Sequence, residues 1–255
     1  MAQSYGGRGR EERPRARRGA RRAPRPRIRV EEGGGTRTLV VDETFASFYR
    51  PGEIATHCVW DAIAAPILWL PPKRRRRILV LGLGGGSVAR IARALAPRAE
   101  IVGIEFEPEV VRLARRHLDL DETGVKVEIA DARAWVEAES KKATRYDAIL
   151  EDVFVGAGDD VHKPAWIPDP MHAQAFGMLA PGGVFVSNTL DEHARVARSM
   201  RARFEGLVAI ETEDYDNRVL AAGGPGLTGA ALRERVAASE VLAPSLDVLS
   251  FRKRA

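Results

Sequence analysis

The sequence predicts an α/β fold: a doubly wound, mostly parallel sheet of seven strands with an antiparallel last strand, preceded by a small N-terminal β-hairpin. A buried apolar run ends in a glycine-rich turn at residues 82–86 and leads into a helical pattern. Short apolar runs then alternate with amphipathic segments, which is typical of strands joined by crossover helices. Two β-like runs close in sequence, 207–213 and 218–222, must pair antiparallel, because a parallel pair needs a long crossover.

The elements follow in order along the chain. Residues 28–50 alternate apolar and polar positions around three glycines, which predicts the hairpin. Residues 55–70 have helical spacing and stop at a Pro-Pro pair. The remaining expected elements are strands at 78–82, 100–105, 125–130, 146–152 and 183–188, and helices at 87–96, 108–120, 132–140, 169–179 and 191–204. These elements divide the chain into a disordered Arg-rich tail (1–27), the hairpin (28–54) and one larger Rossmann-like α/β domain (55–255).

Composition excludes several classes of protein. The chain has 255 residues and is 45% hydrophobic, which suits one large soluble α/β domain. Cys58 is the only cysteine, so the sequence carries neither a disulfide framework nor a thiolate metal cluster, and its histidines lack metal-ligand spacing. No apolar run approaches the ~20 residues that span a bilayer. We therefore expect a cytoplasmic protein without a metal site or a membrane partner.

The net charge of +5 is unevenly distributed. Residues 1–30 hold eleven arginines and two glutamates, which leaves −4 for residues 31–255. The tail has too few apolar residues to fold alone, and it lacks the apolar core of a secretory signal. Two interpretations stay open: a solvated, disordered extension, or a weak electrostatic contact with a polyanion such as nucleic acid.

The glycine-rich turn predicts a nucleoside-binding site. Gly82, Gly84, Gly85 and Gly86 let the backbone approach a ligand closely, and the helix that follows is expected to present free N–H groups. Glu105 ends the next strand, where a carboxylate accepts hydrogen bonds from ribose hydroxyls. This pattern is shared by proteins that bind nicotinamide cofactors, flavins and S-adenosylmethionine (SAM).

Two more carboxylates are expected at the same sheet edge. Asp131 is placed to accept from an adenine amino group while the N–H of Ala132 meets a ring nitrogen; alternatively, Asp131 caps the helix that starts at Ala132. Asp152 follows the fourth strand, where it either deprotonates an amine nucleophile or stabilises an Asx turn. In the loop beyond it, Asp159 either attracts a cationic acceptor or is simply solvated, and His162 either gates the pocket or lies on the surface.

In these motifs residues 36–224 resemble the spermidine synthase family and its relatives in the class I SAM-dependent methyltransferase superfamily. The matching segments are the hairpin, the glycine turn, Glu105, and the runs 129–132, 146–152 and 179–186. The resemblance implies a Rossmann-like fold in which the glycine turn, Glu105, Asp131 and Ala132 hold the adenosyl part of the donor. It also matches Asp152 to the family's proposed base and Tyr215 to a tyrosine that lines the acceptor channel, and it implies a homodimer.

Two departures from the family bear on the transferred group. Aminopropyltransferases carry an acid where this chain has Gly85, and a second acid where it has Val155. Decarboxylated SAM has a primary ammonium and no carboxylate, so a site without a compensating acid leaves that charge unpaired. SAM brings its own carboxylate. The favoured function is therefore methyl transfer from SAM to an amine or similar nucleophile, with a small-molecule or protein amine as the expected acceptor.

Two alternatives remain at this point. One is aminopropyl transfer from decarboxylated SAM to a polyamine, as in spermidine synthase. The other is a non-catalytic nucleoside-binding relative that contacts a polyanion through its tail.

Overall fold

A computed structural model describes residues 26–252, so nearly all of the predicted Arg-rich tail and its polyanion contact lie outside the described residues. The strands are β1 (Ile28–Gly33), β2 (Thr36–Val41), β3 (Thr44–Tyr49), β4 (Arg77–Leu81), β5 (Glu100–Glu105), β6 (Lys126–Ile129), β7 (Tyr146–Glu151), β8 (Leu179–Thr189), β9 (Gly206–Thr212), β10 (Arg218–Gly223) and β11 (Leu249–Arg252). The helices are α1 (Val59–Ala64), α2 (Ser87–Leu95), α3 (Pro108–His117), α4 (Ala132–Glu139), α5 (Met171–Gly177), α6 (His193–Arg201) and α7 (Gly229–Ala237).

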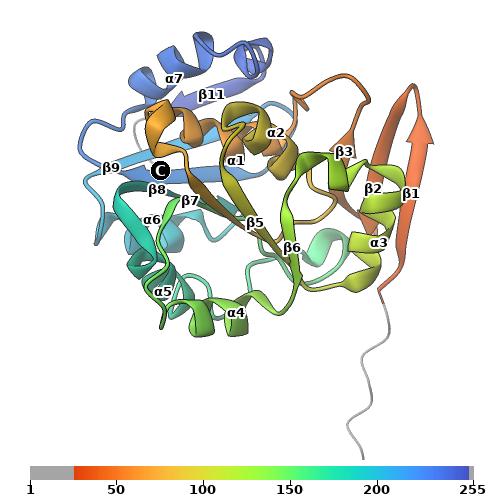
Figure 1. The fold of residues 1–255 in the computed structure, drawn as a ribbon, viewed down its shortest axis with the longest axis horizontal. Coiled ribbons are helices and arrows are strands. Elements are labelled where there is room, and N and C mark those ends of the chain that lie inside the picture. The colour runs from red at the N-terminus through yellow and green to blue at the C-terminus, as the bar shows by residue number, and fades with distance from the viewer. Residues whose placement is uncertain (1–25, 253–255) are drawn as a thin grey trace, which may run out of the picture.

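The strands form two sheets (Figure 1). A three-stranded antiparallel sheet has the order β1-β2-β3, and an eight-stranded sheet has the order β11-β9-β10-β8-β7-β4-β5-β6. Strands β4 to β8 pair in parallel, whereas β10 runs antiparallel between β8 and β9. The predicted mostly parallel, doubly wound sheet and its closing antiparallel hairpin are confirmed.

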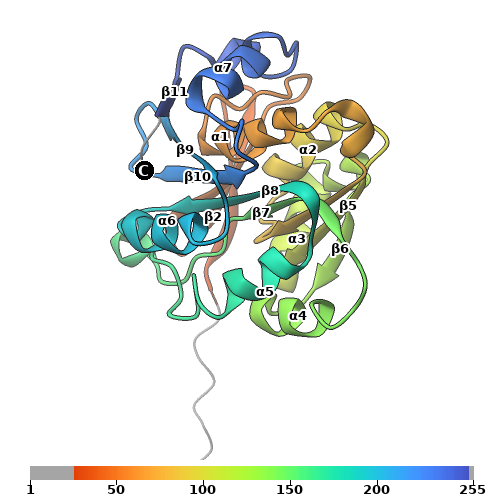
Figure 2. The ribbon, with the colours of Figure 1, turned by 90° about the vertical axis from the view of Figure 1, so that its left-hand side faces the viewer.

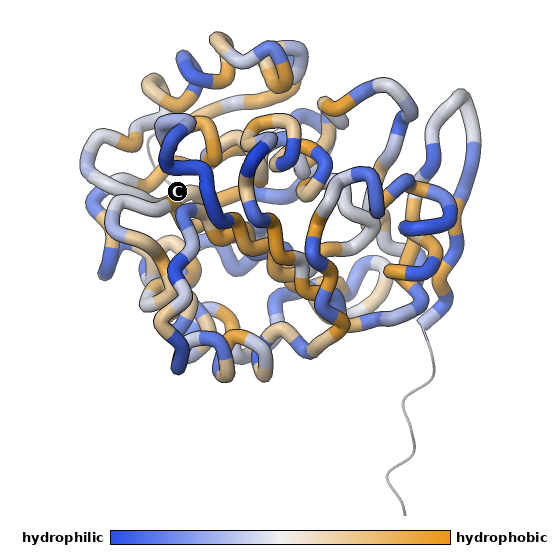
Figure 3. Tube along the Cα trace, viewed as in Figure 1, coloured by the Kyte–Doolittle hydropathy of each residue, from blue (hydrophilic) through white to orange (hydrophobic). Residues whose placement is uncertain are grey.

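Helices cover both faces of the large sheet (Figure 2). Alternate residues of β4 show how the strands serve the two sides: Ile78 and Val80 pack with α1 and α2, whereas Leu79 and Leu81 pack with α4 and α5. The apolar positions are concentrated along the strands through the middle of the fold (Figure 3). Because these strands are buried on both faces, they are nearly continuous apolar runs.

The large sheet has one strand more than expected, because β11 adds to β9 at its edge. This strand has only four residues and little apolar alternation, so its sequence is a weak signal. Helix α7 was likewise not predicted. Its apolar residues Leu232 and Val236 are buried in the core. The segment lies beyond the alternating strand and helix patterns on which the predicted elements rest.

The N-terminal segment forms three strands where a hairpin was expected. Gly34 and Gly35 make the predicted turn between β1 and β2, both with positive φ. The second turn, between β2 and β3, uses Asp42 and Glu43, at φ 45° and 65°. Such a turn usually contains glycine or asparagine, so the sequence does not mark it clearly.

The expected helix over 55–70 is shorter in the structure. It divides into α1 and a 3-10 helix, Ala65–Trp69, and it begins only at Val59. The buried carboxylate of Asp61 accepts from the backbone N–H groups of Thr56 and His57, at 2.8–3.1 Å. These bonds hold the preceding segment in a turn, with His57 at φ 54°.

Strand β3 docks the small sheet onto the start of α2. The buried hydroxyl of Ser87 donates to the carbonyl oxygen of Phe48 at 2.8 Å and accepts from the N–H of Phe48 at 3.0 Å. Nearby, Tyr49 donates to Asp119 at 2.5 Å, and the guanidinium of Arg90 lies 4.3 Å from the ring centre of Tyr49. The N-terminal sheet is therefore tied to the helix that follows the glycine turn. Within residues 26–252, no helix is long and apolar enough to cross a membrane.

We expect Ser87→Ala to lower the free energy of unfolding by about 1–3 kcal/mol, because both backbone polar groups of Phe48 lose their partner. Urea unfolding measures this change. Ser140→Ala is the control, since that hydroxyl bonds only within its own helical turn. Equal stability of the two variants would mean that the Ser87 bridge contributes nothing to docking.

Candidate functional site

The candidate site lies at the carboxyl ends of the parallel strands. Strands β7, β4, β5 and β6 are neighbours in the sheet, so the turns and side chains that follow them meet at one edge. The glycine turn follows β4, Glu105 ends β5, Asp131 follows β6 and Asp152 follows β7. The fold thus brings the predicted donor and base residues to the same edge of the sheet.

The backbone N–H groups of residues 82–86 all donate hydrogen bonds within the protein. The N–H groups of Gly82 and Leu83 donate to the carbonyl oxygen of Ile104, and that of Gly86 donates to Leu83. The N–H of Gly84 donates to Glu105 at 2.8 Å. The N–H of Gly85 donates at 2.6 Å to the hydroxyl of Ser47, which was not predicted. A carboxylate that binds the N–H of Gly85 must therefore replace Ser47, while the free N–H groups expected in the helix that follows the turn stay a prediction.

The turn is also packed too tightly for side chains. A Cβ on Gly82 would lie 2.4 Å from the carbonyl oxygen of Asp152. A Cβ on Gly85 would lie 2.7 Å from the Cβ of Ser47 and 2.8 Å from Leu118 Cδ2. The position where aminopropyltransferases carry an acid is therefore closed by its neighbours in this chain.

Glu105 is held between two loops, beside exposed apolar residues. One carboxylate oxygen accepts from Gly84 and the other from the N–H of Glu107 at 3.0 Å. Burial raises the pKa of Glu105, although these backbone bonds oppose the change. Phe106 is 69% exposed and Ile129 is 53% exposed, which is unusual for such residues. Phe106 follows Glu105 directly, and Ile129 is paired with Glu105 across β5 and β6, so both exposed apolar side chains lie beside Glu105. Their exposure was not predicted from the sequence.

Asp131 has the capping role that the sequence allowed. It is the N-cap of α4, and its side chain accepts from the N–H of Ala134 at 2.8 Å. The residue is exposed, whereas Ala132 is buried at the first position of the helix. Capping fixes the orientation of Asp131 at the sheet edge and leaves its carboxylate accessible.

Asp152 is a half-buried carboxylate with neutral hydrogen-bond partners. Asn188 on β8 donates to it at 2.8 Å, and the side chain of Trp60 also donates to it. Asn188 in turn accepts from Asn217 at 3.1 Å. Burial raises the pKa of Asp152, while attraction by the ammonium of Lys163 opposes this change. A carboxylate with a raised pKa in a positioned network is suited to accept a proton.

Tyr215 belongs to an aromatic cluster that includes Trp60, a hydrogen-bond partner of Asp152. Its ring stacks on Phe45 with centroids 6.4 Å apart, and Phe45 meets Trp60 edge-on at 4.9 Å. Burial raises the pKa of Tyr215, and a hydrogen bond with Cys58 adds to the effect. The aromatic cluster joins β3, α1 and the β9–β10 turn.

The loop residues Asp159 and His162 are both exposed. The Nδ1 atom of His162 lies 2.7 Å from the carbonyl oxygen of Asp160, so its recorded hydrogen bond stays within the loop. The loop itself reaches the small sheet, because the N–H of Gly158 donates to the carbonyl oxygen of Asp42 at 3.1 Å. Their predicted acceptor roles stay predictions.

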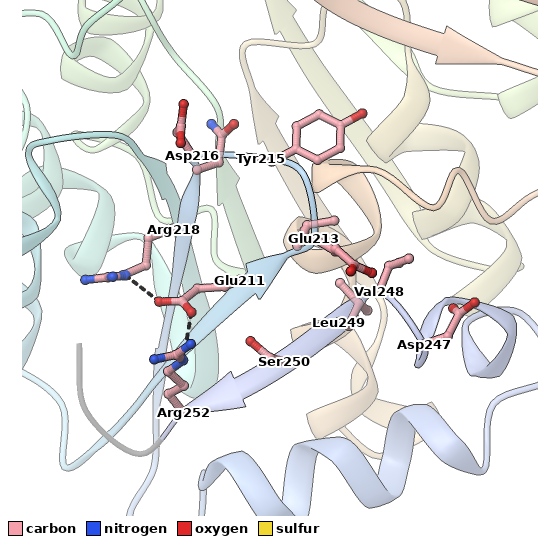
Figure 4. Close-up of a pocket in the computed structure, with 12 residues that line it drawn as sticks. Glu211, Glu213, Tyr215, Asp216, Arg218, Asp247, Val248, Leu249, Ser250 and Arg252 are labelled. Atoms are coloured by element: carbon pink, nitrogen blue, oxygen red, sulfur yellow. Dashed lines mark hydrogen bonds and ion pairs between the residues drawn. The ribbon is translucent and has the colours of Figure 1, made fainter.

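A hollow of about 500 Å³ lies beyond Tyr215, between β9, β10 and β11 (Figure 4). Exposed acids line it, among them Glu213, Asp216 and Asp247. Glu211 is paired with arginines on both neighbouring strands, so it contributes little free charge. The glycine turn, Glu105 and Asp152 do not line this hollow; it adjoins the predicted acceptor side through Tyr215.

A second carboxylate, Glu151, lies fully buried next to Asp152. It pairs with Lys163 at 2.6 Å, accepts from Ser187 at 2.5 Å and lies 3.3 Å from His172 Nε2. Burial opposes ionisation, but attraction by Lys163 and the bond from His172 outweigh it and lower the pKa of Glu151 to about 2. This cluster cannot be recognised from the sequence, because its members are far apart in the chain.

Gly85→Ala should lower the free energy of unfolding by about 1–3 kcal/mol, since the new Cβ overlaps Ser47 and Leu118. Thermal or urea unfolding measures the loss. Gly177→Ala is a matched control, because nothing lies within 4 Å of a Cβ placed there. A Gly85→Ala protein as stable as this control would show that the turn has room for a side chain.

Glu151 should make the free energy of unfolding depend on pH. Its pKa is lowered on folding from an ordinary 4.5, so its contribution is complete above that value and is lost as pH falls toward about 2. We expect the unfolding free energy of Glu151→Gln to decline less steeply than that of the wild type over this range. The unfolding free energy is measured with urea at successive pH values. The same pH dependence in both proteins would contradict the lowered pKa of Glu151.

Known proteins resemble this chain both in sequence and in fold. The sequence matches the family described as Methyltransferase domain over residues 73–224. A polyamine aminopropyltransferase of Vibrio vulnificus is 33% identical over 119 residues, which is 44% of this chain but only 37% of that protein. A probable spermidine synthase of Corynebacterium glutamicum superposes with a TM-score of 0.68 at 21% identity, covering 90% of this chain and 88% of the other.

Human methyltransferase-like protein 13, solved in complex with SAH, superposes with a TM-score of 0.60 at 23% identity, covering 74% of this chain and 93% of the other. Within the part of the chain that the structure describes, no group of three His, Cys, Asp or Glu side chains is arranged to hold a metal ion. The family match covers more than half of the chain. The two solved proteins share its fold. The chain belongs to the family described as Methyltransferase domain.

Proposed function

We propose that this chain transfers a methyl group from SAM to an amine. The observation that carries the proposal is the closure of position 85. Ser47 and Leu118 fill the space into which an acidic side chain would extend. The primary ammonium of decarboxylated SAM would then lack a counter-charge at this position, whereas the ammonium of SAM is accompanied by its own carboxylate.

The residues at the sheet edge fit a SAM-type donor. Glu105 offers carboxylate oxygens to ribose hydroxyls beside the glycine turn, and Asp131 with Ala132 faces the base. The exposed ring of Phe106 and side chain of Ile129 supply an apolar surface for the flat adenine. When bound, SAM supplies a methyl group on a positive sulfur, which reacts by direct displacement.

Asp152 is assigned as the proton acceptor. An amine is mostly protonated at neutral pH, so a base must take its proton before the nitrogen attacks. The new carbon–nitrogen bond forms as the carbon–sulfur bond breaks, and the sulfur keeps that electron pair. Asn188 and Trp60 hold the carboxylate in place while it receives the proton. The acids around the hollow beyond Tyr215 favour a cationic acceptor.

Aminopropyl transfer from decarboxylated SAM to a polyamine is the second candidate. It is favoured by the curated relatives named polyamine aminopropyltransferase, such as that of Vibrio vulnificus. It requires another acid to take the place of the one missing at Gly85.

Calorimetry with each donor, joined to mass spectrometry of products from polyamines and cell extract, separates these candidates. We expect tighter binding of SAM and products heavier by one methyl group. Asp152→Asn should lower kcat by about 100-fold or more, because the base is lost, with donor affinity nearly unchanged. Glu137→Gln, an exposed acid on α4, is the control.

Three other outcomes would contradict methyl transfer. Tighter binding of decarboxylated SAM with aminopropyl products would establish the second candidate. Donor binding without any product would favour a non-catalytic nucleoside-binding protein, and binding of neither donor would overturn all three interpretations.

A further inference from the structure

A buried ion pair joins the two ends of the loop that follows Asp152. Glu151 is the last residue of β7, and Lys163 lies twelve positions later, beyond the exposed loop. Both side chains have no exposed surface, and the Nζ and Oε1 atoms are 2.6 Å apart. The backbone N–H of Lys163 also donates to Glu192 at 2.7 Å, which anchors this end of the loop to the start of α6.

The same pair holds the peptide groups directly after Asp152. Glu151 Oε1 accepts from the N–H of Val153 at 2.7 Å, and Lys163 Nζ donates to the carbonyl oxygen of Val153 at 2.9 Å. On the other side, the N–H of Asp152 donates to the carbonyl oxygen of Leu81 at 2.8 Å. The backbone around Asp152 is therefore fixed at both ends, by β4 and by the ion pair.

The ammonium of Lys163 has further contacts that define its place. It lies 3.9 Å from the ring centre of Phe154, over the first turn of the loop. Burying such a pair gives little net stability, because the loss of hydration offsets the attraction between the charges. Apolar side chains would fill this space about as well. The contacts with Val153 are what apolar side chains could not supply.

We propose that Lys163 is a positioning residue, which acts through Glu151 and Val153 to fix the Asp152 carboxylate and the loop 154–162 at the acceptor side of the site. This proposal rests on the proposed function of Asp152 as the base. A carboxylate displaced by about 1 Å loses much of its effect on a transfer reaction, by up to ~100-fold. The charged groups next to Asp152 are Lys163 and Glu151; its other partners, Asn188 and Trp60, are neutral.

The test compares four variants with the wild type. Lys163→Met removes the charge and the donor group while keeping the length of the side chain. The double variant Glu151→Gln with Lys163→Met also removes the unpaired charge that the single change leaves. Lys163→Arg is the conservative variant, and Lys142→Met, which removes an exposed lysine paired with Glu139, is the matched control.

We expect Lys163→Met to lower kcat by about 10- to 100-fold, with the dissociation constant for SAM changed less than about 2-fold. Its pH profile should also change: the acid limb of kcat/KM moves to higher pH, because Asp152 loses the attraction of a nearby cation. Amide hydrogen exchange in residues 153–162 should become about tenfold faster. Lys163→Arg should recover part of the activity, and Lys142→Met should match the wild type.

The double variant is decisive if the single variant folds poorly. It should regain thermal stability yet keep the low kcat and the fast exchange, because Val153 still lacks its donor. Wild-type kcat and protected loop amides in the double variant would overturn the proposal. If the wild-type protein turns over no amine at all, the proposed function fails, while the exchange rates still decide whether the pair fixes the loop.

Discussion

The backbone of the glycine turn lies in direct contact with three other segments, and the arrangement of the site depends on that contact. Gly82 abuts the carbonyl of Asp152, Gly85 abuts Ser47, and Gly86 abuts Leu120. Side chains at these three positions would keep β3, the β7 loop and the α3 region apart. Because all three positions are glycine, the turn comes into contact with the backbone of Asp152 and with the N-terminal sheet.

The pKa values of two adjacent acids at the end of β7 are shifted in opposite directions. Glu151 meets an ammonium and a histidine, so its charged form is favoured and its pKa falls. Asp152 meets neutral donors from Asn188 and Trp60, so burial prevails and its pKa rises. The charged form of one carboxylate is thereby favoured, and its neighbour accepts a proton more readily.

Much of this could be read from the sequence, because the relevant signals are local. Strand runs, helical patterns and carboxylates at strand ends place the glycine turn, Glu105, Asp131 and Asp152 at one edge. What could not be read depends on contacts between distant segments. Nothing in the sequence around Ser47 marks it as the partner of Gly85. Lys163 lies in a loop segment whose sequence does not indicate that its side chain is buried. The turn at Asp42 and Glu43 has a backbone conformation that these residue types seldom adopt, so the third strand was missed.

The hydrogen bonds from β3 to the glycine turn have a consequence for how this protein is divided into modules. The family match spans residues 73–224, yet the groups that complete its donor turn, the hydroxyl of Ser47 and the backbone of Phe48, lie outside that range. The matched range therefore depends on residues outside it for part of the hydrogen bonding at the glycine turn. Transplanting it onto another protein would leave the turn open on one side. The small sheet is therefore an integral part of the structure around the glycine turn.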